Sequence, residues 1–394
     1  MRRLSAHYLF DGFSWIKYGI LEIDASGFII DIRDPGGDIQ EESSLEFYPG
    51  LLVPGFVNSH CHLELSYLKD KVRRGKGLPS FIYDVTTQRH DTPLQKKLDA
   101  AQKADRKMYN EGIVAVGDIS NDSFCLPIKK ESRIHYHSFI EVIGLDENCK
   151  EKMQYFKETH RAYHEEGMPV SYAAHAPYSM HPELWKLLLE ILEKDAPFSM
   201  HNQETAEENQ LFKKGEGALK VLLEKMGFST GMFFKTQHSS SLQAMLPYLD
   251  KIGKLLLVHN TYTSEKDLQY ILQQNQDCFF AFCPESNLFI EKALPDIATF
   301  RKATEHICIG TDSYASSPSL SVLEQLKKLA EYFPGIPLDE LIRWSGINGA
   351  RALGIDDRFG SFEIGKSPGV VWIEHVDLKQ MKLLPESKAQ RLVP

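Results

Sequence analysis

The sequence predicts an α/β protein built around a (β/α)8 barrel, and three observations carry this prediction. The chain has 394 residues, which is enough for one large barrel with a smaller domain attached. Between about residues 55 and 355, short apolar runs alternate with longer amphipathic stretches, as in successive βα units. Eight such runs occur, the number that a closed barrel needs. A doubly wound sheet would normally add a glycine-rich phosphate turn after an early strand, and we find none.

The predicted barrel strands share a short apolar core followed by a polar or turn residue. They span residues 55–58, 113–118, 134–139, 170–175, 198–201, 255–259, 279–283 and 307–312. Each strand is followed by a stretch with helical periodicity, so the strands are expected to run parallel.

The two ends of the chain have a different character. Residues 19–24 and 28–32 alternate apolar and polar side chains around the turn 25–27, which predicts a β-hairpin. Residues 360–365 are expected to form a turn-rich β stretch and 369–374 a buried strand. We therefore predict a small β-sandwich domain from residues 1–54 plus 356–394, and a catalytic barrel domain from residues 55–355.

Composition excludes several classes of protein. The net charge is −9 and the isoelectric point about 5.9, so the basic surface of a nucleic-acid-binding protein is missing. The six cysteines are scattered without C-x-x-C spacing. No apolar run reaches the length of a signal core or membrane span. These features predict a cytoplasmic protein with no membrane or nucleic-acid partner.

The most informative feature is the position of the histidines and acids at the ends of the predicted strands. In a (β/α)8 barrel the carboxyl ends of the strands form the active-site face, so residues far apart in sequence converge there. The residues in such positions are His60, His62, His175, His201, His259 and Asp312.

A metal site is the strongest chemical reading of this set. His60 and His62 are two residues apart on a strand, so both side chains point to one face while Cys61 points away. The H-x-H spacing alone is weak evidence, because His135 and His137 share it. Together with His201 and Asp312 it gives three imidazoles and one carboxylate, a set suited to zinc or iron with room for a water.

Two further residues have competing interpretations. Glu204 lies three residues after His201 and could serve as a general acid/base, but it also opens an acidic run before a helix, where carboxylates favour the helix dipole. His259 could orient the attacking water or polarise the substrate, or it could be a core histidine bonded to the backbone. If His201 is a ligand, the catalytic role of Glu204 is favoured.

Several segments resemble the amidohydrolase superfamily, a group of metal-dependent hydrolases, in its chlorohydrolase and aminopurine deaminase branch. The resemblance covers almost the whole chain, and its motifs occur in the order of the family. They are P-G-F-V-N-S-H-C-H at 54–62, H-N-Q-E-T at 201–205, G-T-D-S at 310–313, N-G-A-R-A-L-G at 348–354 and G-S-F-E-I-G at 360–365.

The resemblance implies roles for the residues that match these motifs. The implied metal ligands are His60, His62, His201 and Asp312. Glu204 would shuttle a proton, His259 would lie near the leaving group, and Asp312 would also act as base toward the attacking water. Binuclear members bridge two metals with a modified lysine, but residues 173–178 contain none, so one divalent metal, zinc or iron, is expected.

The resemblance also points to the substrate. The H-A-P-Y segment at 175–178 is similar to the deaminase branch, which makes His175 and Tyr178 substrate-binding candidates. The stretch from Leu63 to Arg89 resembles aminofutalosine deaminases, where Glu64 would contact the substrate unless it only opens a helix. Glu285 departs from many relatives and would repel a substrate carboxylate if it faced the site.

We therefore expect a deaminase that replaces a ring amino group of an aminopurine nucleoside with oxygen. The alternatives are a hydrolase of another C–N or C–Cl bond at the same metal site, or a catalytically inactive relative that serves as a scaffold. The partner would be a small heterocyclic substrate. Homodimers are common in the family, so the resemblance leaves a homodimer open.

Overall fold

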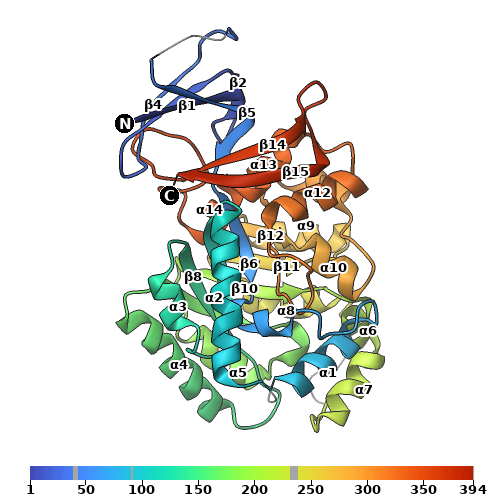
Figure 1. Ribbon diagram of the computed structural model, residues 1–394. Helices are drawn as coiled ribbons and strands as arrows, with labels where there is room; N and C mark the ends of the chain where they lie inside the picture. The colour runs from blue at the N-terminus through green and yellow to red at the C-terminus, as the bar shows by residue number, and fades with distance from the viewer. Residues whose placement is uncertain (39–42, 90–91, 231–237, 394) are drawn as a thin grey trace.

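The barrel is present in the computed structural model, which describes residues 1–38, 43–89, 92–230 and 238–393 (Figure 1). Eight parallel strands follow one another around it in chain order. They are β6 (Phe56–Cys61), β7 (Ile113–Ser120), β8 (His135–Val142), β9 (Val170–Ala174), β10 (Pro197–Asn202), β11 (Lys254–His259), β12 (Cys278–Phe282) and β13 (Ile307–Ile309). Each corresponds to one of the predicted strands, so the predicted fold class is confirmed.

The barrel closes between its first and last strands through hydrogen bonds just beyond β13. The main-chain N–H groups of Thr311 and Asp312 donate to the carbonyl oxygen of His60 over 2.9 and 3.1 Å. The side chain of Asn58 accepts from the Thr311 amide at 3.0 Å and donates to its hydroxyl at 2.7 Å. This closure brings Asp312 beside His60, although 252 positions separate them in the chain.

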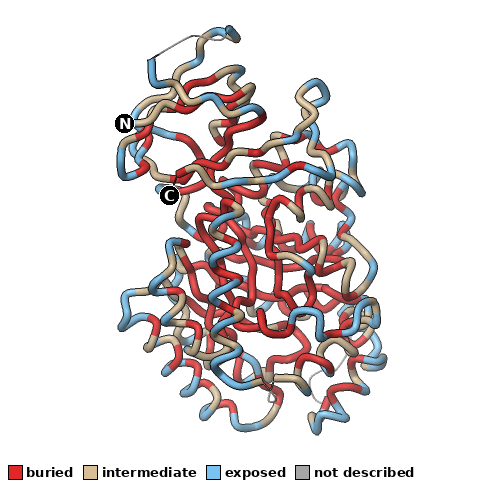
Figure 2. The backbone as a smooth tube through the Cα atoms, in the orientation of Figure 1, coloured by how far each residue is buried: buried red, intermediate tan, exposed pale blue. Residues whose placement is uncertain are grey.

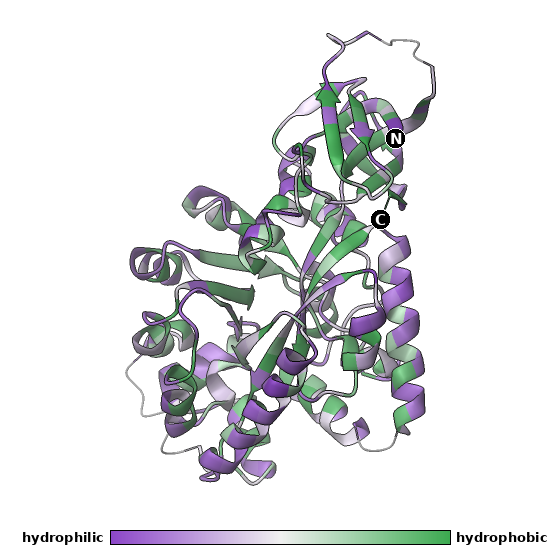
Figure 3. Ribbon diagram, turned by 90° about the vertical axis from the view of Figure 1, so that its left-hand side faces the viewer, coloured by the Kyte–Doolittle hydropathy of each residue, from purple (hydrophilic) through white to green (hydrophobic). Residues whose placement is uncertain are grey.

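Helices surround the barrel, and their outer faces are polar while the strands inside are buried (Figures 2 and 3). In α12, for example, the buried Leu323, Leu326 and Leu329 recur every three residues on one face. Within the described residues, no helix is long and apolar enough to cross a membrane. The helices are η1 (Leu63–Leu68), α1 (Leu78–Gln88), α2 (Leu94–Asn110), α3 (Leu126–Glu131), α4 (Cys149–Glu165), η2 (Pro177–Ser179), α5 (Pro182–Leu189), α6 (Ala206–Lys214), α7 (Ala218–Lys225), α8 (Ser241–Leu249), α9 (Glu265–Gln274), α10 (Pro284–Ile290), α11 (Ile297–Ala303), α12 (Val322–Tyr332), α13 (Leu338–Ser345) and α14 (Ile347–Leu353).

A second sheet combines both ends of the chain and lies above the barrel in Figure 1. Its strands are β1 (Arg2–Phe10), β2 (Trp15–Lys17), β3 (Ile20–Ile23), β4 (Ile29–Arg33), β5 (Leu45–Pro54), β14 (Val370–Asp377) and β15 (Lys382–Val393). The predicted hairpin is present as the antiparallel pair β3 and β4. β14 pairs with β5, so the C-terminal segment joins the N-terminal one. The exact domain bounds at residues 54 and 355 stay a prediction.

Gly55 connects this sheet to the barrel. A Cβ atom at this position would lie 2.1 Å from Cγ1 of Val114 and 2.5 Å from the carbonyl oxygen of Pro368. Only glycine allows the chain to pass so close to its neighbours.

One expected β element is absent. Residues 360–365 form turns and not a strand, because Gly360 and Gly365 have φ angles of 90° and 87°, which interrupt extended backbone. The segment still packs on the terminal sheet through Phe362, which is buried, and its amide donates to the carbonyl oxygen of Asp11 at 2.6 Å.

A buried ion pair lies under the first barrel strands. Lys129 is fully buried, and its Nζ lies 2.6 Å from Oδ2 of Asp118. The same ammonium donates to the hydroxyls of Ser120 and Ser138 at 2.7 and 3.0 Å. Oδ1 of Asp118 accepts from the main-chain N–H of Leu63 at 2.8 Å, so the pair also fixes the chain directly after His62.

We predict that Lys129→Met lowers the free energy of unfolding by about 3–5 kcal/mol, because it leaves the Asp118 carboxylate buried without its counter-charge. The measurement is the shift of the urea unfolding midpoint. Lys130→Met is the matched control, since Lys130 is an exposed neighbour whose ion pair with Glu166 is worth little. Equal midpoints for the two variants would contradict the prediction.

Candidate active site

Three imidazoles and one carboxylate meet at the carboxyl ends of the barrel strands. The Nε2 atoms of His62 and His201 are 3.3 Å apart, and His60 lies close enough to share one ion with them. Oδ1 of Asp312 lies 3.5 Å from His62 Nε2 and 3.8 Å from His60 Nε2. Two nitrogens about 2.0–2.1 Å from a tetrahedral ion would be separated by about 3.3 Å. The arrangement fits a divalent metal ion.

Hydrogen bonds outside the cluster leave its inward-facing atoms free. Nδ1 of His201 lies 2.7 Å from the carbonyl oxygen of His175, which can only accept, so this nitrogen carries the proton and Nε2 has the lone pair. Oδ2 of Asp312 accepts from the hydroxyls of Ser286 and Ser316, both at 2.6 Å, which leaves Oδ1 for the cluster. Such outer contacts typically orient metal ligands.

The protonation states of the cluster also fit a cation site. Burial, together with the neighbouring imidazoles, holds the pKa of His60 and of His62 well below the usual range. Both nitrogens of His60 are buried and without a hydrogen-bond partner. The pKa of Asp312 is lowered: burial opposes the shift, but the nearby imidazoles and two serine hydroxyls outweigh it. Neutral imidazoles and an ionised carboxylate are the forms that bind metals.

Glu204 and His259 lie beside the cluster. Oε1 of Glu204 is 3.6 Å from Nε2 of His259, and both side chains are buried. Burial raises the pKa of Glu204 to about 8, although the neighbouring imidazole of His201 opposes the shift. Nδ1 of His259 bonds to Oδ1 of Asn287 at 2.9 Å, so its Nε2 faces the site. Glu204 is thus an acid that can hold a proton at neutral pH, next to a histidine of fixed orientation.

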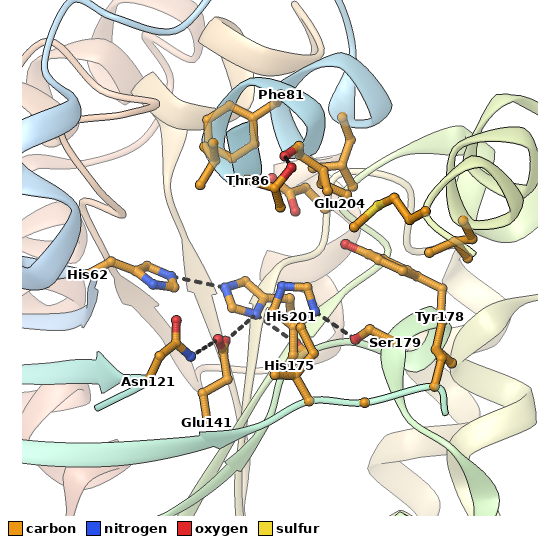
Figure 4. A pocket seen from close by; sticks show the side chains of 18 of the residues that line it. His62, Phe81, Thr86, Asn121, Glu141, His175, Tyr178, Ser179, His201 and Glu204 are labelled. Atoms are coloured by element: carbon orange, nitrogen blue, oxygen red, sulfur yellow. Dashed lines mark hydrogen bonds and ion pairs between the residues drawn. The ribbon is translucent and has the colours of Figure 1, made fainter. Parts of the chain in front are cut away.

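A cavity of about 300 Å³ opens over these residues. Figure 4 shows His62, His175 and His201 on one side of it, with Phe81 and Glu204 across from them. Apolar side chains from α1 and the α7 region form much of its wall, among them Leu78, Phe81, Ile82, Val85, Leu223 and Met226. A flat, largely apolar molecule with a polar reacting edge matches this lining.

The residues expected to contact substrate fall into two groups. His175 and Tyr178 line the cavity, and Nδ1 of His175 lies 2.7 Å from the hydroxyl oxygen of Ser179. Glu64 lies in η1 behind the wall, where its carboxylate accepts from Arg89 Nη2 at 2.9 Å and from the Asn121 amide at 3.0 Å.

The structure places Glu285 and the second H-x-H pair away from the cavity. Glu285 accepts hydrogen bonds from Ser317 and Gln325 near the surface. It does not face the site, so it does not repel a substrate carboxylate. The second H-x-H pair, His135 and His137, belongs to the start of β8, far from the carboxyl ends of the strands. That pair therefore has no part in the cluster, whereas Cys61 packs outward in the main hydrophobic core as expected.

Sequence reasoning missed three polar residues that line the cavity or support it: Asn121, Glu141 and Asn287. Asn121 follows β7, and Glu141 is the last residue but one of β8. Both occupy the strand-end positions that identified the histidines, so the same rule could have found them. Asn287, which orients His259, lies on α10 and carries no comparable signal.

The family model that describes the amidohydrolase family matches residues 51–387 of the chain. This match spans most of the sequence, so the chain belongs to the amidohydrolase family. The predicted family and the predicted class of hydrolytic enzyme are thereby confirmed.

Relatives with known names are consistent with this membership. The chain is 27% identical to an adenosine deaminase of Helicobacter pylori over 81% of this chain and 78% of the relative. It is also 27% identical to an aminodeoxyfutalosine deaminase of Nitratiruptor, over 82% and 79% of the two chains. A crystal structure of H. pylori aminofutalosine deaminase with methylthio-coformycin superposes with a TM-score of 0.80 at 22% identity, over 94% and 91% of the chains. That likeness shows the shared fold.

We predict that His201→Ala abolishes tight metal binding, because it removes one of three imidazoles that share a single centre. Metal content per chain after dialysis against zinc is the measurement. His164→Ala is the matched control, since His164 is exposed on α4 and should leave the metal content unchanged. Full metal content in His201→Ala would exclude this residue as a ligand.

Proposed function

We propose that the protein deaminates a 6-aminopurine nucleoside, replacing the ring amino group with oxygen and releasing ammonia. The observation that carries this proposal is Glu204, a buried acid with a pKa raised to about 8, facing His259 beside the cluster of imidazoles. Attack of water on the ring carbon is promoted by protonation of the adjacent ring nitrogen, and a protonated carboxyl can supply that proton. The names of the relatives, adenosine and aminodeoxyfutalosine deaminases, support the same reaction.

We propose that His60, His62, His201 and Asp312 hold one divalent ion, zinc or iron(II). When bound, such an ion lowers the pKa of a coordinated water from about 15.7 to about 7. A second ion is disfavoured. The neighbouring group of Glu141, His175 and His201 shares His201 with the first cluster, and Nδ1 of this imidazole already donates its proton to a carbonyl oxygen, so only Nε2 remains for one ion.

The proton transfers of the reaction are then carried out by two side chains of the site, Asp312 and Glu204. Asp312 Oδ1 accepts a proton from the water that attacks the ring carbon. Glu204 gives its proton to the adjacent ring nitrogen and later takes up the proton of the new hydroxyl group. Asp312 passes the proton that it took from the water to the amino group, which leaves as ammonia. His259 donates from Nδ1 to Asn287, so the lone pair of its Nε2 faces the site and can orient the attacking water by accepting a hydrogen bond from it. One water enters and one ammonia leaves, so the reaction is balanced.

The state of the cysteines supports the proposal that the protein is a metabolic enzyme of the cytoplasm. All six cysteines are buried free thiols, which is usual for proteins of a reducing compartment.

The direct test is ammonia release by zinc-loaded protein from adenosine, aminofutalosine, free adenine and cytosine. Release from a purine nucleoside is the expected result. Absence of ammonia from every compound, with metal demonstrably bound, would overturn the proposed reaction and favour another hydrolytic bond at the same site.

We predict that Glu204→Gln keeps the bound metal but lowers kcat by about 10²–10⁴-fold, because the amide cannot donate the proton that the carboxyl provides. Glu207→Gln is the matched control, since Glu207 lies on α6 and its carboxylate accepts from the Ala218 amide. Metal content and turnover are measured on the same samples. Unchanged turnover in Glu204→Gln would remove Glu204 from the mechanism.

A further inference from the structure

The wall of the cavity next to the metal cluster contains a hydrogen-bond acceptor that has no donor. Glu141 lies near the end of β8, is only 3% exposed and lines the cavity. Its Oε2 accepts from Nδ2 of Asn121 at 2.6 Å. Its Oε1 is buried and has no hydrogen-bond partner. A buried carboxylate oxygen without a donor is costly, so this atom calls for a donor from a bound molecule.

The nearest donor in the protein does not satisfy Oε1. Nδ1 of His201 lies 3.6 Å away, beyond hydrogen-bond distance, and its proton points to the carbonyl oxygen of His175 at 2.7 Å. Glu141 therefore is not bonded to this candidate metal ligand. A hydrogen-bond donor for Oε1 therefore has to come from a molecule that enters the cavity.

The carboxylate of Glu141 is held firmly in place by a chain of polar side chains. Asn121 donates to Glu141, and Oδ1 of Asn121 accepts from the guanidinium of Arg89. Arg89 and the main-chain amide of Asn121 both donate to Glu64. This chain explains the buried Glu64 as a support behind the wall (Figure 4 shows Asn121 and Glu141 within it). An acceptor fixed in this way is preorganised for a ligand.

The chemistry of the proposed substrate identifies the donor. In a 6-aminopurine nucleoside, the donors other than the amino group that leaves are the hydroxyl groups of the sugar. The amino group must lie between the cluster and Glu204. Figure 4 shows Glu141 beside His201, across the cavity from Glu204. The sugar then extends along the wall that Glu141 occupies.

We infer that Glu141 accepts a hydrogen bond from a sugar hydroxyl and thereby selects nucleosides over free bases and over deoxy analogues. This inference rests on the proposed deamination of an aminopurine nucleoside. It makes Glu141 a residue that determines specificity, and Asn121 and Arg89 residues that position it. Hydrogen bonds to a charged acceptor are among the stronger ones in proteins, so a large discrimination is expected.

The test compares kcat/KM for ammonia release from adenosine, 2′-deoxyadenosine, 3′-deoxyadenosine and adenine in zinc-loaded wild type and Glu141→Ala. In wild type, removal of the recognised hydroxyl should lower kcat/KM by roughly 10- to 100-fold. In Glu141→Ala, adenosine should fall by a similar factor, and the same deoxy analogue should lose nothing more. Glu147→Ala, an exposed position in the loop after β8, should behave as wild type.

Metal content and a second variant separate this role from a structural one. Glu141→Ala and Glu141→Gln should both keep the metal content and the unfolding midpoint near those of wild type. An equal loss on all four substrates, or a loss of metal, would overturn the inference and show that Glu141 acts through His201. If wild type releases ammonia from no aminopurine, the proposed function itself fails and the inference fails with it.

Discussion

The closure of the barrel between β6 and β13 is the interaction on which the rest of the site depends. The amides of Thr311 and Asp312 donate to the carbonyl oxygen of His60. The side chain of Asn58, on the first strand, makes two hydrogen bonds to Thr311. Gly310 permits the close approach, since a Cβ there would lie 2.8 Å from Cβ of His60. Because the bonds to His60 are between main-chain atoms, they set the position of a carboxylate relative to an imidazole before any metal binds.

The site is then refined by contacts that lie outside it. Two serine hydroxyls donate hydrogen bonds to one oxygen of Asp312, and a carbonyl oxygen accepts a hydrogen bond from Nδ1 of His201. The remaining atoms therefore face a common centre. The backbone shows the cost of this arrangement. His259 and Asp312 adopt left-handed φ angles of 72° and 57°, as does Gln203 at 46°, and each such residue costs about 1–3 kcal/mol. Packing and hydrogen bonds in the rest of the barrel offset that strain.

The cavity has two chemically different ends. At one end the buried Glu204 is an acid beside His259, suited to protonating a ring nitrogen. At the other, Glu141 is a fixed acceptor held by Asn121. An apolar wall with Phe81 connects them. The nucleoside proposed as substrate would place its electron-poor ring at the acid end and its sugar hydroxyl groups at the acceptor end.

The sequence by itself determined the barrel and the positions of the site residues along its strands. Short apolar runs mark the strands locally, and parallel strands must present their carboxyl ends together, so His60, His201 and Asp312 could be predicted to converge. It did not determine Asn287 or Ser316, which orient His259 and Asp312 from helices and loops. It also predicted β structure at 360–365, where glycines with positive φ make turns. Only the tertiary structure decided these points, because hydrogen-bond partners distant in sequence are fixed by closure of the barrel and not by any local pattern.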